Sequence, residues 1–144
     1  MFSIRTMLLQ DYDTVIGLMQ TTPGVSLRDA DSRDATERYL VRNPGLSFVA
    51  LVDGAIVGCI MSGHDGRRGY LQHLLVAPGH RRQGLAKALI AQCLAALAEL
   101  GIVKSHIDVL TTNTPAQAYW AKAGWTRRDD IVRYSLIRSD NPNA

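Results

Sequence analysis

One stretch of this chain constrains its fold most. It consists of an apolar segment, a basic loop with a glycine, and a long amphipathic helix, in that order. Residues 71–76 have the Leu and Val content of a central strand. After Gly84, apolar side chains recur at helical spacing, at Leu85, Leu89, Cys93, Leu97 and Leu100. The first-turn amides of a helix have no partners within it and favour an anion, and Arg81 and Arg82 add positive charge. Because Gly84 has no Cβ, a ligand can come close to the backbone, and the stretch predicts a phosphate site.

The remaining pattern predicts strands and helices in alternation. Strands are expected at residues 3–7, 46–52, 55–62, 70–76, 105–110, 125–127 and 131–137. Helices are expected at about residues 11–20, 32–41, 85–100 and 113–123. The Asp53-Gly54 pair is a strong hairpin signal, so the strands from residue 46 to 76 are expected to be antiparallel neighbours. The strand, helix, strand order from residue 70 to 110 predicts a parallel pair.

The length of 144 residues predicts a single domain, with a core at about residues 2–137 and a polar tail at 138–144. The chain is 47% apolar and 20% charged, which is ordinary for a soluble globular protein. Thirteen of the sixteen basic residues are Arg, which suits bidentate contacts to phosphate or carboxylate. The net charge is only +3, without a basic stripe interleaved with aromatic residues, so a nucleic-acid partner is not expected.

Cys59 and Cys93 fall inside an apolar strand and an apolar helix. Buried free thiols are therefore expected, which fits a reducing cytoplasm. No Cys and His spacing typical of a metal site is present, and no metal is expected. The N-terminal residues do not have the pattern of a signal peptide, and no apolar run has the length of a membrane span, so no membrane partner is expected.

A second pattern follows the strand at residues 105–110. It consists of Asn113, Ala116, the pair Tyr119-Trp120 and the pair Gly124-Trp125. Asn113 can cap the last helix and can also hydrogen-bond a ligand, because its amide both donates and accepts. Tyr119 and Trp120, taken alone, are expected to pack in the core.

At these two stretches the chain resembles the GCN5-related N-acetyltransferase (GNAT) family, and within it the small bacterial members similar to YpeA. The motif Q/R-x-x-G-x-G/A of that family is matched by Arg81, Gly84 and Ala86, and its second motif by residues 113–125. The resemblance covers roughly residues 2–137. It implies an α/β (α+β) fold, with a mixed, mostly antiparallel sheet of six to seven strands, a splayed parallel strand pair and four flanking helices.

The resemblance implies transfer of an acetyl group from acetyl-CoA, as co-substrate, to a primary amine of a small molecule or protein by direct attack in a ternary complex. The loop after the central strand would cradle the pyrophosphate, and the strand edge would pair with the pantetheine amides. A backbone amide near Leu75 would polarise the thioester carbonyl. The cofactor-binding residues that it implies are Leu74, Leu75, Val76, Arg81, Arg82, Gln83, Gly84, Leu85, Ala86, Lys87, Asn113, Tyr119 and Trp120.

The proton donor to the leaving thiolate is open. Many family members use a tyrosine at the second place of the aromatic pair, where this chain has Trp120, and an indole cannot act as the acid. Tyr119 precedes it and points about 100° away around the helix. Three possibilities stay open. Tyr119 reaches the thiolate by a different tilt, or another group or water supplies the proton, or the thiolate leaves with little help from an acid.

Candidates for the general base lie on the strand before the loop, at Tyr70, Gln72 and His73. Neighbouring strand residues lie on opposite faces, and a bulge, which is common in the family, could change which of Gln72 and His73 faces the acceptor. A histidine is the side chain best suited to exchange a proton near neutral pH. The catalytic candidates are therefore Tyr119, His73 and Tyr70.

The acceptor pocket is expected between the first two helices, residues 22–34 and residues 127–130. Carboxylates there would attract a cationic amine, at Asp29, Asp31, Asp129 and Asp130. Nearby arginines could instead hold a carboxylate, so the identity of the acceptor stays open, as does the choice between a monomer and a homodimer. The alternative function is a non-catalytic acyl-CoA sensor on the same fold, which Trp120 keeps open.

Overall fold

A five-stranded sheet, with its strands in the spatial order β1-β2-β3-β4-β5, is the centre of the fold. The strands are β1 (Ser3–Thr6), β2 (Phe48–Val52), β3 (Ala55–His64), β4 (Gly69–Val76) and β5 (Ser105–Ile107). Neighbours are antiparallel except β4 and β5, which are parallel, as predicted. The computed structural model describes residues 1–144, which form two compact units, residues 1–107 and 108–144. The whole sheet belongs to the first unit, and the single-domain expectation stays a prediction.

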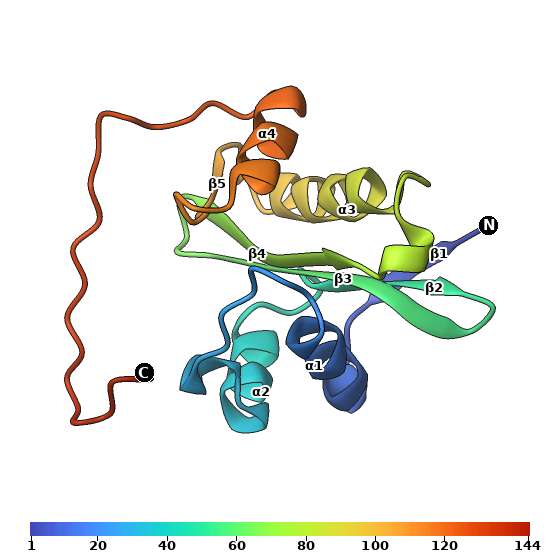
Figure 1. Ribbon diagram of the computed structural model, residues 1–144, viewed down its shortest axis with the longest axis horizontal. Helices are drawn as coiled ribbons and strands as arrows, with labels where there is room; N and C mark the ends of the chain where they lie inside the picture. The colour runs from blue at the N-terminus through green and yellow to red at the C-terminus, as the bar shows by residue number, and fades with distance from the viewer. The chain divides into compact units, whose positions relative to one another are not determined.

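Helices cover both faces of this sheet (Figure 1). On one face lie α1 (Tyr12–Gln20), which follows the 3-10 helix Leu9–Asp11, and α2 (Arg33–Arg42). On the other face lies α3 (Leu85–Glu99), whose residues Leu85, Leu89, Cys93 and Leu97 are fully buried. The core under α1 consists of Met7, Val15, Met19, Val49, Cys59, Met61 and Leu75. The helical spacing after Gly84 therefore predicted four of the five residues of the buried face correctly, whereas Leu100, just after α3, is 57% exposed.

The turn between β2 and β3 has the conformation that its sequence requires. Asp53 and Gly54 have φ angles of 51° and 79°, both in the left-handed region. Tight hairpin turns of this kind match the twist of the flanking strands, and Asp and Gly tolerate positive φ better than most residues. The hairpin prediction is confirmed.

The smaller unit contains one helix, α4 (Thr114–Lys122). Asn113 caps this helix, because its side-chain oxygen accepts a hydrogen bond from the Ala116 amide at 3.2 Å. Gly124, with a φ of 93°, ends it in the left-handed conformation that favours glycine. The helix predicted at residues 113–123 is confirmed, and so is the capping role of Asn113.

The two last strands predicted at residues 125–127 and 131–137 are wrong. Residues 125–138 form no helix or strand, so the sheet has five strands rather than six to seven. Alternating apolar residues produce a strand only where a neighbouring strand pairs with them. Here the ion pairs of the segment join Arg127 to Asp129, Arg128 to Asp130 and Arg133 to Asp108, and none of these contacts is a strand pairing.

An ion pair whose carboxylate is buried joins β1 to the start of α1. Arg5 donates through Nη1 and Nη2 to the two carboxylate oxygens of Asp11, at 2.7 and 2.8 Å. The Leu8 amide donates to the same carboxylate at 2.8 Å. The Asp11 side chain is only 6% exposed, and the Arg5 guanidinium holds its pKa below the ordinary value despite burial. The pair fixes how the chain enters α1.

None of the helices has the length and apolar composition needed to cross a membrane.

We expect the variant Asp11→Asn to lower the free energy of unfolding by about 1–3 kcal/mol at pH 7, because Arg5 and Leu8 lose a charged acceptor. The pKa of Asp11 is lowered in the folded protein. Its stabilisation is therefore complete above the unfolded carboxyl pKa, about 4, and is lost as the pH falls through the folded value. Urea unfolding at pH 7 and at about pH 3 measures this, with Asp13→Asn on the exposed side of α1 as control. An unchanged difference from wild type at the two pH values contradicts the prediction.

Candidate active site

The strand β4 carries a β-bulge at its centre. Cys59 of β3 faces Leu75 and Met61 faces Gln72, so three steps along β4 correspond to two along β3. Facing residues of an antiparallel pair share one face of the sheet, so Gln72 and Leu75 both lie toward α1 with Cys59 and Met61. Within the bulge, His73 has a φ of 52°, in the left-handed region that histidine enters more readily than most residues.

The bulge turns Gln72 and His73 toward the same side of the sheet. Nε2 of His73 lies 2.8 Å from Oδ1 of Asp31, which ends the 3-10 helix Asp29–Asp31 between α1 and α2. The Gln72 side chain hydrogen-bonds Tyr39 of α2. In a regular strand, neighbouring side chains would point to opposite faces. Here both reach the elements that cover the α1 face.

The pair formed by His73 and Asp31 is well shielded from water. The side chains are 17% and 16% exposed. A carboxylate only accepts hydrogen bonds, so Nε2 carries the hydrogen and donates it to Asp31. Nδ1 of His73 has no hydrogen-bond partner among the protein groups. In the neutral ring, the lone pair is therefore on Nδ1.

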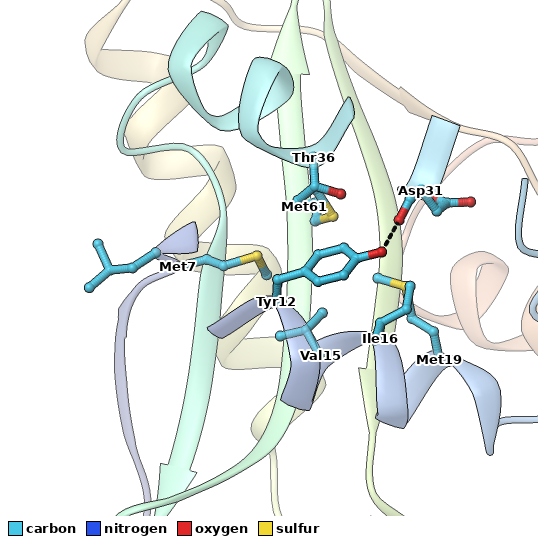
Figure 2. A pocket seen from close by; sticks show the side chains of 9 residues that line it. Met7, Tyr12, Val15, Ile16, Met19, Asp31, Thr36 and Met61 are labelled. Carbon is cyan, nitrogen blue, oxygen red and sulfur yellow. Dashed lines mark hydrogen bonds between the residues drawn. The ribbon is translucent and has the colours of Figure 1, made fainter. Parts of the chain in front are cut away.

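Asp31 also lines a small pocket between α1, α2 and β3. Figure 2 shows Tyr12 crossing it, with its hydroxyl donating to the backbone carbonyl of Asp31 at 2.7 Å. The other lining residues are mostly apolar, at Met7, Leu8, Val15, Ile16, Met19, Thr36 and Met61. The free volume is about 10 Å³, enough for a single water molecule. Three of the lining residues are methionines, whose unbranched side chains rearrange readily, so the walls can adapt.

One edge of β4 is left without a strand. The parallel pairing runs only from Gly69 opposite Ser105 to Leu71 opposite Ile107, while β4 continues to Val76. Beyond Leu71, the backbone groups on the β5 side have no strand partner. An open edge of this kind is suited to an extended ligand with peptide-like groups, which adds to the sheet as a strand would.

The loop after β4 presents an uncapped helix N-terminus. Arg82 and Gly84 have φ angles of 62° and 84°, and no side chain caps α3. A Cβ at Gly84 would meet no heavy atom within 4 Å, so the space beside this residue is open. Arg82 and Gln83 are exposed, and Arg81 donates through Nε to the Val76 carbonyl at 3.2 Å. These groups fit a phosphate.

The other residues predicted for the cofactor differ in accessibility. Leu85 is 1% exposed, so its side chain belongs to the core and only its amide is suited to a ligand. Lys87 is exposed and Ala86 is half-buried. On β4, Leu75 is buried, whereas Leu74 and Val76 are half-buried.

The aromatic pair of the smaller unit is divided between surface and interior. Trp120 is 7% exposed and packs edge-on against Trp125, with ring centres 4.8 Å apart. Tyr119 is 39% exposed and stands perpendicular to Trp120, and partial burial raises the pKa of its hydroxyl. Tyr119 is therefore protonated at neutral pH.

Two candidates from the sequence have partners that no local pattern indicates. The hydroxyl of Tyr70 donates to Asp65 in the turn between β3 and β4, at 3.4 Å, so it is directed toward that turn. The pairing of Asp31 with His73 joins residues 42 positions apart. The sequence offered Asp31 only as one of several carboxylates for a cationic amine.

Over residues 12–125 the chain matches the model of the acetyltransferase (GNAT) family. It is 38% identical over 96 residues to an acetyltransferase of Yersinia enterocolitica, covering 67% of this chain and 68% of that protein. An acetyltransferase of Pectobacterium atrosepticum is 34% identical over 129 residues, with 90% and 91% covered. The solved structure of AAC(6')-Iy, in complex with a bisubstrate analogue that contains CoA, is 25% identical with a TM-score of 0.73, covering 95% and 99%. The chain belongs to the GNAT acetyltransferase family.

Neither cysteine is suited to carry an acyl group. Cys59 and Cys93 are free thiols with no exposed surface, as predicted, and burial raises their pKa to about 12 and about 11. A nucleophilic cysteine needs an accessible thiolate. Cys59 and Cys93 are therefore not suited to form an acyl-cysteine intermediate.

We expect a disulfide reagent to react with the native protein only as slowly as the protein opens, because the thiols are buried and protonated. Both thiols should react at once in concentrated urea. Absorbance of the released aromatic thiol measures both rates. Stoichiometric reaction of native Cys59 within seconds contradicts this description of the site.

Proposed function

We propose that this protein transfers an acetyl group from acetyl-CoA to a primary amine of a small molecule or protein, by direct attack in a ternary complex. The observation that carries the proposal is that backbone groups are left open at two places that follow one another in the chain. The edge of β4 has no strand partner beyond Leu71, and the N-terminus of α3 is uncapped. A pantetheine arm has peptide-like amides, and a pyrophosphate is the anion at its end, so acetyl-CoA matches both places. AAC(6')-Iy, similar in fold, was solved with a CoA-containing analogue.

The pyrophosphate would be held by the amides of residues 82–87. The side chains of Arg82, Gln83 and Lys87 are exposed beside these amides and would add charge and hydrogen bonds. The backbone of residues 74–76 would pair with the pantetheine amides. Asn113, Tyr119 and Trp120 stay predictions from the second family motif.

In the transfer step, the neutral amine forms a bond to the acetyl carbon. A backbone amide near Leu75 would stabilise the negative charge that develops on the carbonyl oxygen. The carbon–sulfur bond then breaks, and the CoA thiolate leaves with the electron pair. His73 is the proposed proton acceptor for the amine, because it is the histidine on the α1 face beside the open edge. A reducing cytoplasm is the proposed location, since both cysteines are free.

We expect Gly84→Asp and Arg82→Ala to weaken acetyl-CoA binding by about tenfold or more, the loss expected for one charge-assisted contact to phosphate. Asp tolerates the left-handed conformation and favours a helix N-terminus, so Gly84→Asp should keep the fold while repelling the pyrophosphate. Arg67→Ala, in the exposed turn between β3 and β4, is the matched control. Calorimetry measures binding, and thermal unfolding measures stability.

If the wild-type protein shows no binding at high micromolar acetyl-CoA, the proposal is wrong. If both variants unfold while Arg67→Ala does not, the loop is structural. Binding without release of CoA thiol in the presence of any amine of a diverse library favours the acyl-CoA sensor instead.

We expect Tyr119→Phe to leave kcat within about twofold, because a CoA thiolate leaves readily and the proton donor contributes little. Tyr119→Phe keeps the ring that packs against Trp120. Release of CoA thiol at saturating acetyl-CoA and amine measures kcat. A loss of about tenfold or more, with an unchanged KM for acetyl-CoA, would instead assign the acid role to Tyr119.

A further inference from the structure

We propose that Asp31 is a positioning residue, which fixes the proton of His73 on Nε2 and thereby leaves Nδ1 to accept the proton of the attacking amine. This inference rests on the proposed acetyl transfer. It assigns the residue that orients the proposed proton acceptor, His73, which the family resemblance leaves open. It concerns residues 1–107 alone, since both residues and their hydrogen-bond partners lie in the larger unit.

Asp31 is held by three hydrogen bonds, two to its carboxylate and one to its backbone carbonyl. Oδ1 accepts from Nε2 of His73 at 2.8 Å, and Oδ2 accepts from the backbone amide of Arg28 at 2.9 Å. The backbone carbonyl of Asp31 accepts from the Tyr12 hydroxyl at 2.7 Å (Figure 2). A rotation of the carboxylate would break the bonds to both Arg28 and His73. Asp31 is therefore placed as a rigid acceptor, in contrast to a solvated carboxylate that would attract cations.

The backbone that carries the imidazole is fixed by strand pairing. His73 lies in the bulge of β4 with a φ of 52°, so its backbone direction is set by the pairing of β4 with β3. Its side chain is 17% exposed and uses Nε2 for Asp31. The two neutral tautomers of a free imidazole are close in energy, so a single strong acceptor decides which nitrogen carries the proton. Here that acceptor selects the tautomer with a free lone pair on Nδ1.

The protons of the transfer step are accounted for by the amine, His73 and water. The amine nitrogen forms its bond to the acetyl carbon, and the proton that it must lose moves to Nδ1 of His73. The ring then carries protons on both nitrogens, and its positive charge faces the negative Asp31. The carbon–sulfur bond breaks, and the CoA thiolate leaves with the electron pair. Water then takes the proton from Nδ1 and restores the neutral ring.

Asp31→Asn separates a positioning role from a merely structural one. The carboxylate accepts from two donors, the Arg28 amide and Nε2 of His73, whereas an asparagine has one acceptor oxygen and a donating NH₂. When the oxygen faces the backbone amide, the NH₂ faces Nε2. The imidazole must then accept at Nε2 and carry its proton on Nδ1, which is the wrong tautomer for a base. The variant keeps two hydrogen bonds, so the fold should persist.

The first measurement is independent of activity. Nitrogen-15 NMR of histidine-labelled protein, with the His73 signals assigned by His73→Gln, should show the proton on Nε2 in the wild type and on Nδ1 in Asp31→Asn. Asp34→Asn removes an exposed carboxylate from the first turn of α2 and makes the same change in charge, so it should leave the wild-type tautomer. An unchanged tautomer in Asp31→Asn overturns the proposal.

The second measurement is a double-mutant cycle on kcat with any amine that the wild type acetylates. His73→Ala should lower kcat by about a hundredfold, the usual contribution of a general base. Asp31→Asn should lower it by a similar factor with little change in the KM for acetyl-CoA. Added to His73→Ala, Asp31→Asn should cost nothing further, because Asp31 acts only through the ring. Equal losses in both backgrounds overturn the proposal.

The outcomes for the two proposals are distinguishable. A wild type that has the expected tautomer but acetylates no amine overturns the proposed function and the catalytic use of the pair together. A wild type that acetylates amines but keeps its kcat in Asp31→Asn retains the proposed function and loses only the role of Asp31.

Discussion

The unequal pairing of β4 is the constraint on which the candidate site depends. On one side, β4 pairs with β3 along nearly all of its length; on the other, it pairs with β5 at three positions only. The first pairing fixes the strand, and the second leaves the edge beyond Leu71 open. The bulge at His73 belongs to the same strand, and its extra residue is accommodated only because β3 holds the strand on both sides of it. An open edge and a reoriented histidine thus have one origin in the hydrogen bonding of β4.

Those parts of the fold that depend on local pattern could be predicted from the sequence. The buried face of α3 follows from apolar residues at helical spacing, and the β2–β3 hairpin follows from Asp53 and Gly54, whose φ angles are both positive. The parallel pair β4–β5 follows from the strand, helix, strand order. The prediction of strands at residues 125–127 and 131–137 is wrong because alternating apolar and polar residues indicate only that a segment can form a strand. Whether a neighbouring strand pairs with it is a property of the whole chain.

In the candidate site too, features set by a short run of residues could be predicted, and those set by distant residues could not. The loop with Arg82 and Gly84 is recognisable because a short run of residues sets its conformation, and both residues have the left-handed backbone that the turn needs. The partnership of Asp31 with His73 joins residues 42 positions apart, and neither residue carries a local mark of it. Even the direction of His73 depends on a bulge, which is decided by the register of two strands. The sequence could name His73 as one of three candidates but could not find the group that orients it.

This division has a consequence for how the two substrates are recognised. The proposed contacts to acetyl-CoA are mostly backbone groups of β4 and of the first turn of α3, which many side chains can present equally well. The proposed acceptor side is built from side chains of α1 and of the segment between α1 and α2, such as Tyr12 and Asp31, around a pocket lined in part by methionines. Substitutions there change the acceptor surface without touching the sheet edge. If Asp31 orients the base as well, then the segment that selects the amine also holds the group that deprotonates it. An acceptor that displaces this segment would then lose the orientation of its base, so selectivity would act on kcat as well as on binding.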